Sequence, residues 1–117
     1  MNARRICVFA ALLPWLMSNA VSADEHPVLG QGNVTCSVWL EGRQAENVNA
    51  TSRTAWVLGY LTAYNEYGPK EHFDVSDAKS TEELTEWIDK YCQQHRENSL
   101  HKASAAFIET FAEKAAR

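Results

Sequence analysis

The sequence predicts an all-α fold, a small bundle of three to four helices that is stapled by one disulfide between Cys36 and Cys92. Three observations lead to this expectation. Apolar residues recur at helical spacing in several segments, helix start and stop residues border those segments, and two cysteines remain once an N-terminal leader is removed. The chain has 117 residues, which is the size of one domain.

The first 23 residues have the order of parts found in a secretory signal peptide. Arg4 and Arg5 form a basic start, residues 6–17 (ICVFAALLPWLM) are apolar, and small residues lead to a cleavage site after Ala23. The apolar run is shorter than the roughly 20 residues that span a membrane, although an uncleaved anchor is the alternative. We therefore expect residues 1–23 to be cleaved on export, with no membrane contact afterwards.

Cleavage leaves 94 residues with an acidic balance. The leader holds two of the eleven basic residues and none of the fifteen acidic ones, so the formal net charge changes from −4 to −6. An acidic surface argues against nucleic acid and anionic membranes as partners, and it permits a basic protein partner.

Cys7 leaves with the leader, so Cys36 and Cys92 form an even pair in an exported protein. A disulfide is the expected state, because the chain has no CxxC motif and no histidine or further cysteine at ligand spacing from either residue. A metal or redox role is the alternative. Closing a loop of this length, which spans 57 residues, stabilises a fold by ~4 kcal/mol in the chain-entropy model. That gain is comparable with the net stability of a small domain.

Residues 24–33 (DEHPVLGQGN) are polar and contain two glycines, so we expect a flexible lead-in to a helical domain over residues 34–117. Residues 34–40 (VTCSVWL) have the β-branched content of a strand, yet Thr35 can cap a short helix there, and the helix is the favoured interpretation. Residues 42–49 are expected to be a polar connection.

The central helix is expected to begin at Thr51 or Ser52, either of which can cap it, and to reach about Tyr67. Its apolar residues cover most of its circumference, which is typical of a helix buried on several sides. Gly59 lies in its middle, where glycine costs ~1 kcal/mol relative to alanine, so we expect another helix to approach closely there. A Gly-Pro pair that follows directly ends the helix.

The loop over residues 69–79 (PKEHFDVSDAK) is charged, with Phe73 and Val75 as the expected hydrophobic anchors. Its three acidic residues lack the glycine and the spacing of a calcium loop, so a solvated loop is favoured over a cation site.

Two further helices follow the loop. Ser80 and Glu83 form a capping box for the first of them. Its apolar face comprises Leu84, Trp87, Ile88, Tyr91 and Cys92. Ser99 caps the last helix, and the small alanines of that helix allow tight packing. Its apolar face comprises Leu100, Ala103, Phe107, Phe111 and Ala115.

No catalytic constellation stands out in the chain. The serines lack the glycine context of a nucleophile elbow, and the four histidines lack the i, i+4 spacing of a helical metal pair. Four grouped carboxylates suit the positive end and the solvated face of a helix. They are Glu82, Glu83, Glu86 and Asp89. The sequence therefore predicts no enzyme, no metal and no cofactor.

The aromatic residues carry the most information about a binding role. Most of them are expected in the core, since they fall on the apolar faces of the predicted helices. Tyr67 and Trp39 are the two that we expect to be exposed and to anchor a partner.

Several sequence pieces occur together in this chain. They are Cys36 with Trp39-Leu40, residues 56–61 (WVLGYL) followed by Asn65, residues 87–92 (WIDKYC), and an alanine-rich last helix. In this combination the chain, from about Thr35 to Ala112, resembles the small periplasmic Rap/Tai-type immunity proteins of type VI secretion, which are similar to the HdeA-like acid-stress chaperones. The residues of the family pattern are Trp56, Gly59, Tyr60, Asn65, Trp87 and Tyr91. One departure is that residues 93–96 (QQHR) follow Cys92, where such sequences commonly have a proline.

The resemblance implies a periplasmic protein that binds and neutralises a secreted effector. Its partner would be another protein, met by aromatic anchors and by the charged loop. The candidate contact residues are Trp39, Tyr67, Glu71, His72, Phe73, Asp74 and Asp77.

An acid-activated chaperone is the alternative function. Protonation of the carboxylates and histidines would turn the negative charge positive, loosen the bundle and expose aromatic residues to client proteins, while the disulfide prevents complete unravelling. Pairing of two copies through an apolar helix face is compatible with either function.

Overall fold

The computed structural model describes residues 26–45, 47–69 and 73–115. The predicted fold class is confirmed, since this part of the chain forms four α-helices and no strand, and a disulfide joins Cys36 to Cys92 with their Cα atoms 4.8 Å apart. The leader predicted for residues 1–23 lies outside the described residues.

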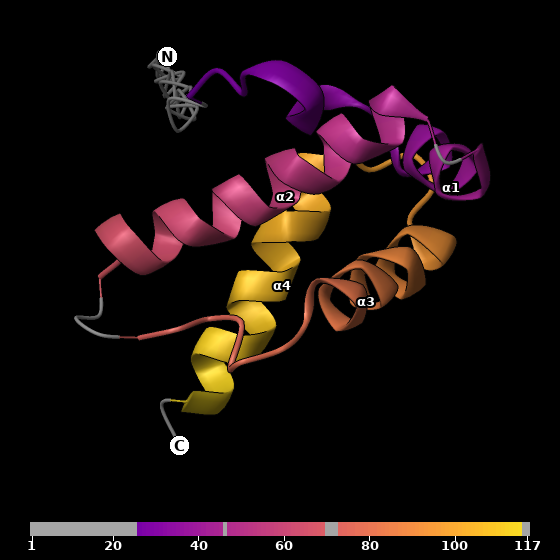
Figure 1. Cartoon of the computed structure of the whole chain (residues 1–117). Coiled ribbons are helices and arrows are strands. Elements are labelled where there is room, and N and C mark those ends of the chain that lie inside the picture. Colours follow the sequence, from indigo (N-terminus) through magenta and orange to yellow (C-terminus); the bar gives the residue numbers. More distant parts are fainter. Residues whose placement is uncertain (1–25, 46, 70–72, 116–117) are drawn as a thin grey trace, which may run out of the picture.

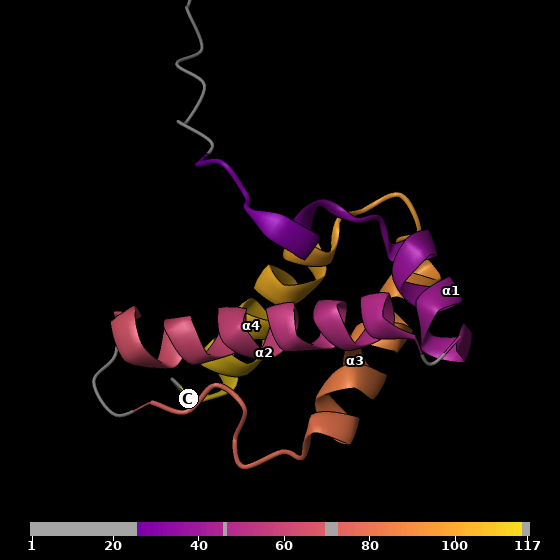
Figure 2. The same ribbon diagram turned by 45° about the horizontal axis from the view of Figure 1, so that its top comes forward.

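The four helices form a bundle in which the first and the last helix each pack on the two helices between them. They are α1 (Cys36–Ala45), α2 (Val48–Tyr67), α3 (Thr81–Gln94) and α4 (Leu100–Ala115), preceded by a 3₁₀ turn, η1 (Gly30–Asn33). α1 packs on α2 and α3, and α4 packs on α1, α2 and α3. Figure 1 shows α2 lying across α4, and Figure 2 shows residues 73–80 running below α2 to reach α3.

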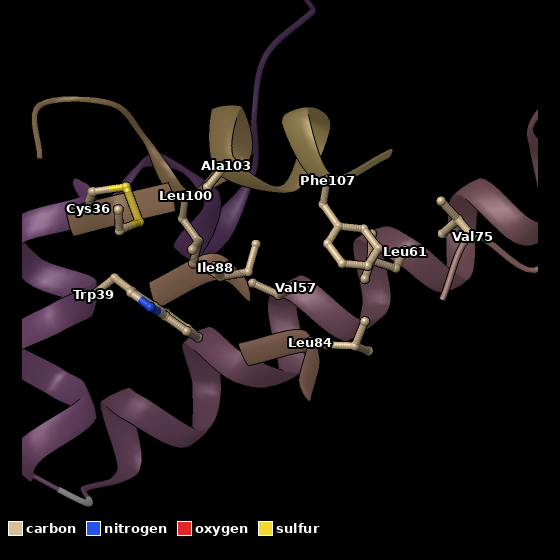
Figure 3. Packing of buried hydrophobic residues seen from close by; sticks show 11 residues of the cluster. Cys36, Trp39, Val57, Leu61, Val75, Leu84, Ile88, Leu100, Ala103 and Phe107 are labelled. Atoms are coloured by element: carbon tan, nitrogen blue, oxygen red, sulfur yellow. A yellow bond between two sulfur atoms is a disulfide. The ribbon is translucent and has the colours of Figure 1, made fainter. Parts of the chain in front are cut away.

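The core contains side chains from all four helices and from the loop before α3. Figure 3 shows Trp39, Ile88 and Phe107 pointing toward the same interior. The buried apolar residues are Cys36, Trp39, Val57, Leu61, Val75, Leu84, Ile88, Cys92, Leu100, Ala103 and Phe107. Val75 is fully buried, so its predicted role as a loop anchor is confirmed.

Three predicted helix starts are confirmed by their hydrogen bonds. In the capping box, the Ser80 N–H donates to Glu83 Oε2 at 2.8 Å, and the Glu83 N–H donates to Ser80 Oγ at 3.2 Å. Ser99 Oγ accepts from the Lys102 N–H at 3.2 Å. Residues 36–40 form a helix, as favoured, and Thr35 Oγ1 accepts from the N–H three residues later.

The predicted start of the central helix is wrong by about one turn. Asn47 caps α2, and its side-chain oxygen accepts from the N–H groups of Asn49 and Ala50, each at 3.1 Å. Asparagine is as good an N-cap as serine or threonine, and this one comes earlier in the chain. The polar connection expected over residues 42–49 is correspondingly shorter, because α1 continues to Ala45.

The lead-in expected to be flexible over residues 24–33 packs on the domain in its described part. η1 contacts α2 and α4, and the indole N–H of Trp56 donates to the Leu29 carbonyl at 2.8 Å. Gly32 is buried against that indole, and a Cβ at this position would lie 2.2 Å from Trp56 Cζ2. The missing side chain therefore lets the segment lie close to α2.

The expectation that another helix approaches Gly59 is wrong. Gly59 is exposed, and nothing lies within 4 Å of a Cβ built on it. α2 buries only Val57 and Leu61, so it meets the core along one side, whereas its small residues Ala55 and Ala63 face outward with Gly59.

Gly59→Ala is therefore expected to stabilise the domain by about 1 kcal/mol, because alanine is the better helix former and the added methyl meets nothing. Gly42→Ala is the matched control in α1. Gly42 is buried, and its Cβ would lie 2.5 Å from Arg53 Nη1, which would have to move and give up its hydrogen bond to the Val38 carbonyl at 3.3 Å, so this change should stabilise less. Urea unfolding of both variants measures the difference, and equal effects would contradict the assignment of an open face at Gly59.

Candidate functional site

The loop between α2 and α3 carries most of the predicted partner contacts. Tyr67 ends α2 and is 88% exposed, as predicted. Phe73 is half-buried, while Asp74 and Asp77 are exposed. The predicted contacts Glu71 and His72 lie outside the described residues.

Asn65, a residue of the family pattern, holds this loop against α2. Its side-chain N–H donates to Asp74 Oδ1 at 3.0 Å, and its side-chain oxygen accepts from the Val75 N–H at 2.8 Å. One amide thus binds a side chain and a backbone group of the loop together. Asn65 therefore ties this part of the loop to the end of α2.

Asp74 organises the rest of the turn. Its carboxylate accepts from the Ser76 hydroxyl at 2.6 Å, from the Ser76 N–H at 2.9 Å and from the Ala78 N–H at 3.3 Å. Asp77 and Ala78 adopt left-handed backbone conformations, with φ of 51° and 58°. The turn is therefore built around one carboxylate and leaves Asp77 projecting from it.

A hollow of about 340 Å³ lies between the loop and the end of α4. The Phe111 ring forms part of its wall, with the ammonium groups of Lys79 and Lys114 at 4.3 and 5.0 Å from the ring centroid. Lys79 also forms an ion pair with Asp77 at 3.5 Å. We define the loop surface as Tyr67, Phe73, Asp74, Asp77 and Phe111.

The hydrogen bond from the Ser76 hydroxyl, together with further bonds from backbone and from Asn65, lowers the pKa of Asp74 below its ordinary value of 3.8. A carboxyl group whose pKa is lower in the folded state than in the unfolded chain stabilises the fold at pH values above its ordinary pKa. This contribution is lost as the pH falls through the lower, folded-state pKa. Asp74→Asn is therefore expected to destabilise the domain at about pH 7 and much less at about pH 3.

Urea unfolding of the wild type and Asp74→Asn at the two pH values measures this difference. Asp77→Asn is the matched control, because the Asp77 side chain is 86% exposed and forms only a surface ion pair with Lys79, which contributes little. A destabilisation by Asp74→Asn that is equal at both pH values would contradict the assigned role of its charge.

The expectation that Trp39 is exposed is wrong, because its side chain is 1% exposed and lies in the core. Its indole N–H donates to Asp89 Oδ1 at 2.7 Å, and Arg43 Nε donates to both Asp89 oxygens at 3.1 Å. The buried ring thus keeps a partner for its polar atom. The i, i+4 spacing of Trp39 and Arg43 was the only signal of this network in the sequence.

The four aromatic residues on which the resemblance rests form two groups. Trp87 and Tyr91 stack along α3, and Trp87 meets Phe107 edge-on. Trp56 and Tyr60 stack along α2 with ring centroids 5.3 Å apart, and the Tyr60 hydroxyl lies 3.2 Å from Nε2 of His101. We define the aromatic corner as Trp56, Tyr60 and His101. The contact with His101 could not be predicted from the sequence, because His101 is 41 residues from Tyr60.

Across the part of the chain that is described, no three histidine, cysteine, aspartate or glutamate side chains come together as a possible metal site. No helix within the same ranges is both long and apolar enough to span a bilayer. The chain matches no family model, no curated protein and no solved structure. The resemblance to immunity proteins therefore stays a prediction from the sequence.

Proposed function

We propose that this chain is a small exported, non-enzymatic domain of the immunity type, which binds and neutralises a secreted effector in the periplasm. The observation that carries the proposal is an exposed aromatic ring two residues after Asn65, which binds the turn over residues 73–79 by hydrogen bonds. Tyr67 is 88% exposed, and the hydrogen bonds of Asn65 hold the neighbouring loop in place. Exposed tyrosines are frequent anchors of protein interfaces.

The hydrogen-bonded turn over residues 73–79 favours binding of a specific partner. Because its hydrogen bonds exist before the partner arrives, binding loses less conformational freedom than it would with an unordered loop. The formal net charge of −4, which becomes −6 without the leader, would steer a basic protein surface toward the domain. Exposed carboxylates at Glu66, Asp74 and Asp77 lie on and beside the loop surface.

The purified, oxidised protein is the bait that tests this proposal, presented at about pH 7 to exported proteins of the source organism. One specific partner should be captured. Tyr67→Ala should weaken its binding by about 30-fold, the effect of losing a hot-spot residue worth about 2 kcal/mol.

Val48→Ala is the matched control, because Val48 is an apolar residue that is 76% exposed at the other end of α2. It should leave the affinity unchanged. Capture of no exported protein would contradict the proposed function. Equal losses with Tyr67→Ala and Val48→Ala would contradict the assignment of the loop surface as the contact.

An acid-activated chaperone is the second candidate. It is favoured by two carboxylates with lowered pKa values, Asp74 in the loop and Glu83 at the start of α3. Hydrogen bonds lower the pKa of Asp74 through Ser76 and that of Glu83 through the Ser80 backbone N–H. Both groups therefore stabilise the fold above their ordinary pKa values and lose that effect as the pH falls below them. In acid, the hydrogen bonds of Asp74 in the loop and those of Glu83 in the capping box of α3 would weaken together.

The chaperone function predicts suppression of aggregation of an acid-labile client enzyme at about pH 2.5 and not at about pH 7, with exposure of apolar surface in the acid. A protein that stays compact and leaves client aggregation unchanged in acid would exclude this candidate. The immunity function predicts the reverse pattern, a selective partner bound at neutral pH.

A further inference from the structure

The aromatic corner consists of two walls at nearly right angles. The Trp56 and Tyr60 rings are stacked with an angle of 22° between their planes. The His101 ring stands edge-on to both, at 84° to Trp56 and 79° to Tyr60, with centroids 6.5 and 5.4 Å away. Three π systems from α2 and α4 thus meet at one place.

A hollow of about 330 Å³ lies at this corner. It is lined by His26, Pro27, Val28, Leu29, Trp56, Tyr60 and His101. The polar groups of the rings are already engaged, since the Trp56 N–H donates to Leu29 and the Tyr60 hydroxyl lies at hydrogen-bonding distance from His101. The rings therefore offer a ligand mainly their π systems, and among the described residues no lysine or arginine lines the hollow.

The carboxylate of Glu109 on α4 acts on the corner. Burial and the Glu109 carboxylate together raise the pKa of Tyr60, so the phenol stays neutral while Glu109 places a negative field on it. The positive end of α4 lies nearby, but three N–H groups of its first turn already have acceptors, since Leu100 donates to the Val34 carbonyl, Lys102 to Ser99 Oγ and Ala103 to the Ser99 carbonyl. An anion is therefore disfavoured relative to a cation.

The same fold makes cation–π contacts elsewhere. Arg43 lies 5.7 Å from the Trp39 ring centroid, and Lys79 lies 4.3 Å from that of Phe111. From the hollow, the ring geometry and the sign of the nearby charge, we propose that the aromatic corner binds an alkylammonium group. This group belongs either to a free small molecule or to a lysine side chain of another protein. The inference does not depend on the proposed function or on the loop surface.

Choline and 3,3-dimethylbutan-1-ol are the matched probes, because they have the same shape and differ in the positive charge. Each is titrated into the purified, oxidised protein at constant ionic strength while NMR follows the indole N–H of Trp56, a wall of the hollow. Choline should shift that resonance saturably and bind at least about fivefold more tightly than the neutral alcohol, as expected for a cation–π site.

Glu109→Gln should weaken choline binding about two- to fivefold, and Tyr60→Leu by at least as much. Glu109 is exposed, so its variant keeps the test valid if Tyr60→Leu fails to fold. Glu86→Gln, an exposed carboxylate on α3, is the matched control and should have no effect. A peptide, acetyl-Gly-Lys-Gly-amide, distinguishes the sources, because tighter binding than choline identifies a protein side chain.

Two results would overturn the inference. One is equal binding of choline and the neutral alcohol, including no saturable shift with either. The other is a choline affinity that is the same in the wild type and Glu109→Gln.

Discussion

Replacement of Cys36 and Cys92 by alanine is expected to lower the free energy of unfolding by about 4 kcal/mol, which is enough to leave much of a domain of this size unfolded at about 37 °C. The two cysteines are 56 residues apart in sequence, so their bond removes a large part of the freedom of the unfolded chain. Both are fully buried, so the replacement also removes packing in the core.

Reduction of the wild type separates these two effects, because it breaks the bond and keeps both sulfur atoms in place. Urea unfolding followed by circular dichroism measures the oxidised, the reduced and the double-alanine protein. The reduced form should lose most of the 4 kcal/mol estimated from loop closure, and the double variant slightly more. A loss below about 1 kcal/mol in both would show that the disulfide is dispensable for this fold.

Phe107→Ala is expected to destabilise the domain by about 3–5 kcal/mol. Phe107 is fully buried in α4, where its ring meets Trp87 edge-on at 5.1 Å and Phe111 at 4.5 Å between centroids. Its removal would leave a cavity between α3 and α4, whose walls are held by the surrounding helices and collapse only in part.

Phe111→Ala is the matched control, one turn later on the same helix. Its ring is half-buried, and it faces the hollow beside the loop, so less apolar area is lost on replacement. Phe107→Leu should fall between the wild type and Phe107→Ala, because it keeps most of the buried volume. Equal losses from Phe107→Ala and Phe111→Ala would contradict the assignment of Phe107 to the centre of the core.

The helices with local signals could be predicted from the sequence. α3 has both halves of a capping box and a single apolar face, and α4 has Ser99 followed by apolar residues at helical spacing. These features act within one or two turns of the chain, so the residues themselves are sufficient to indicate them.

The environment of α2 could not be predicted in the same way. Ala55, Gly59 and Ala63 count as apolar in a periodicity pattern, but they gain little from burial, and here they face outward. The burial of Trp39 was missed for a different reason. The acceptor for its indole N–H is Asp89, which lies 50 residues away in sequence and comes within reach only when α1 packs on α3.

The candidate site was predicted in part. Tyr67 is exposed at the end of α2, and the Gly-Pro pair that follows it ends the helix. The exposure of Tyr67 and the end of the helix both follow from the local sequence. The role of Asn65 in holding Asp74 and Val75 was not visible, because it requires the loop to fold back on α2. The contact of Tyr60 with His101 similarly requires α2 to cross α4.

The disulfide closes one part of the domain into a covalent ring and leaves α4 outside that ring. The ring closed by Cys36 and Cys92 encloses α1, α2 and α3, whereas α4 lies outside it and is joined to it only through the chain after Cys92. Yet α4 supplies Leu100, Ala103 and Phe107 to the common core. Detachment of α4 is therefore a partial opening that the cross-link does not oppose, and its amide protons should exchange through an event smaller than global unfolding.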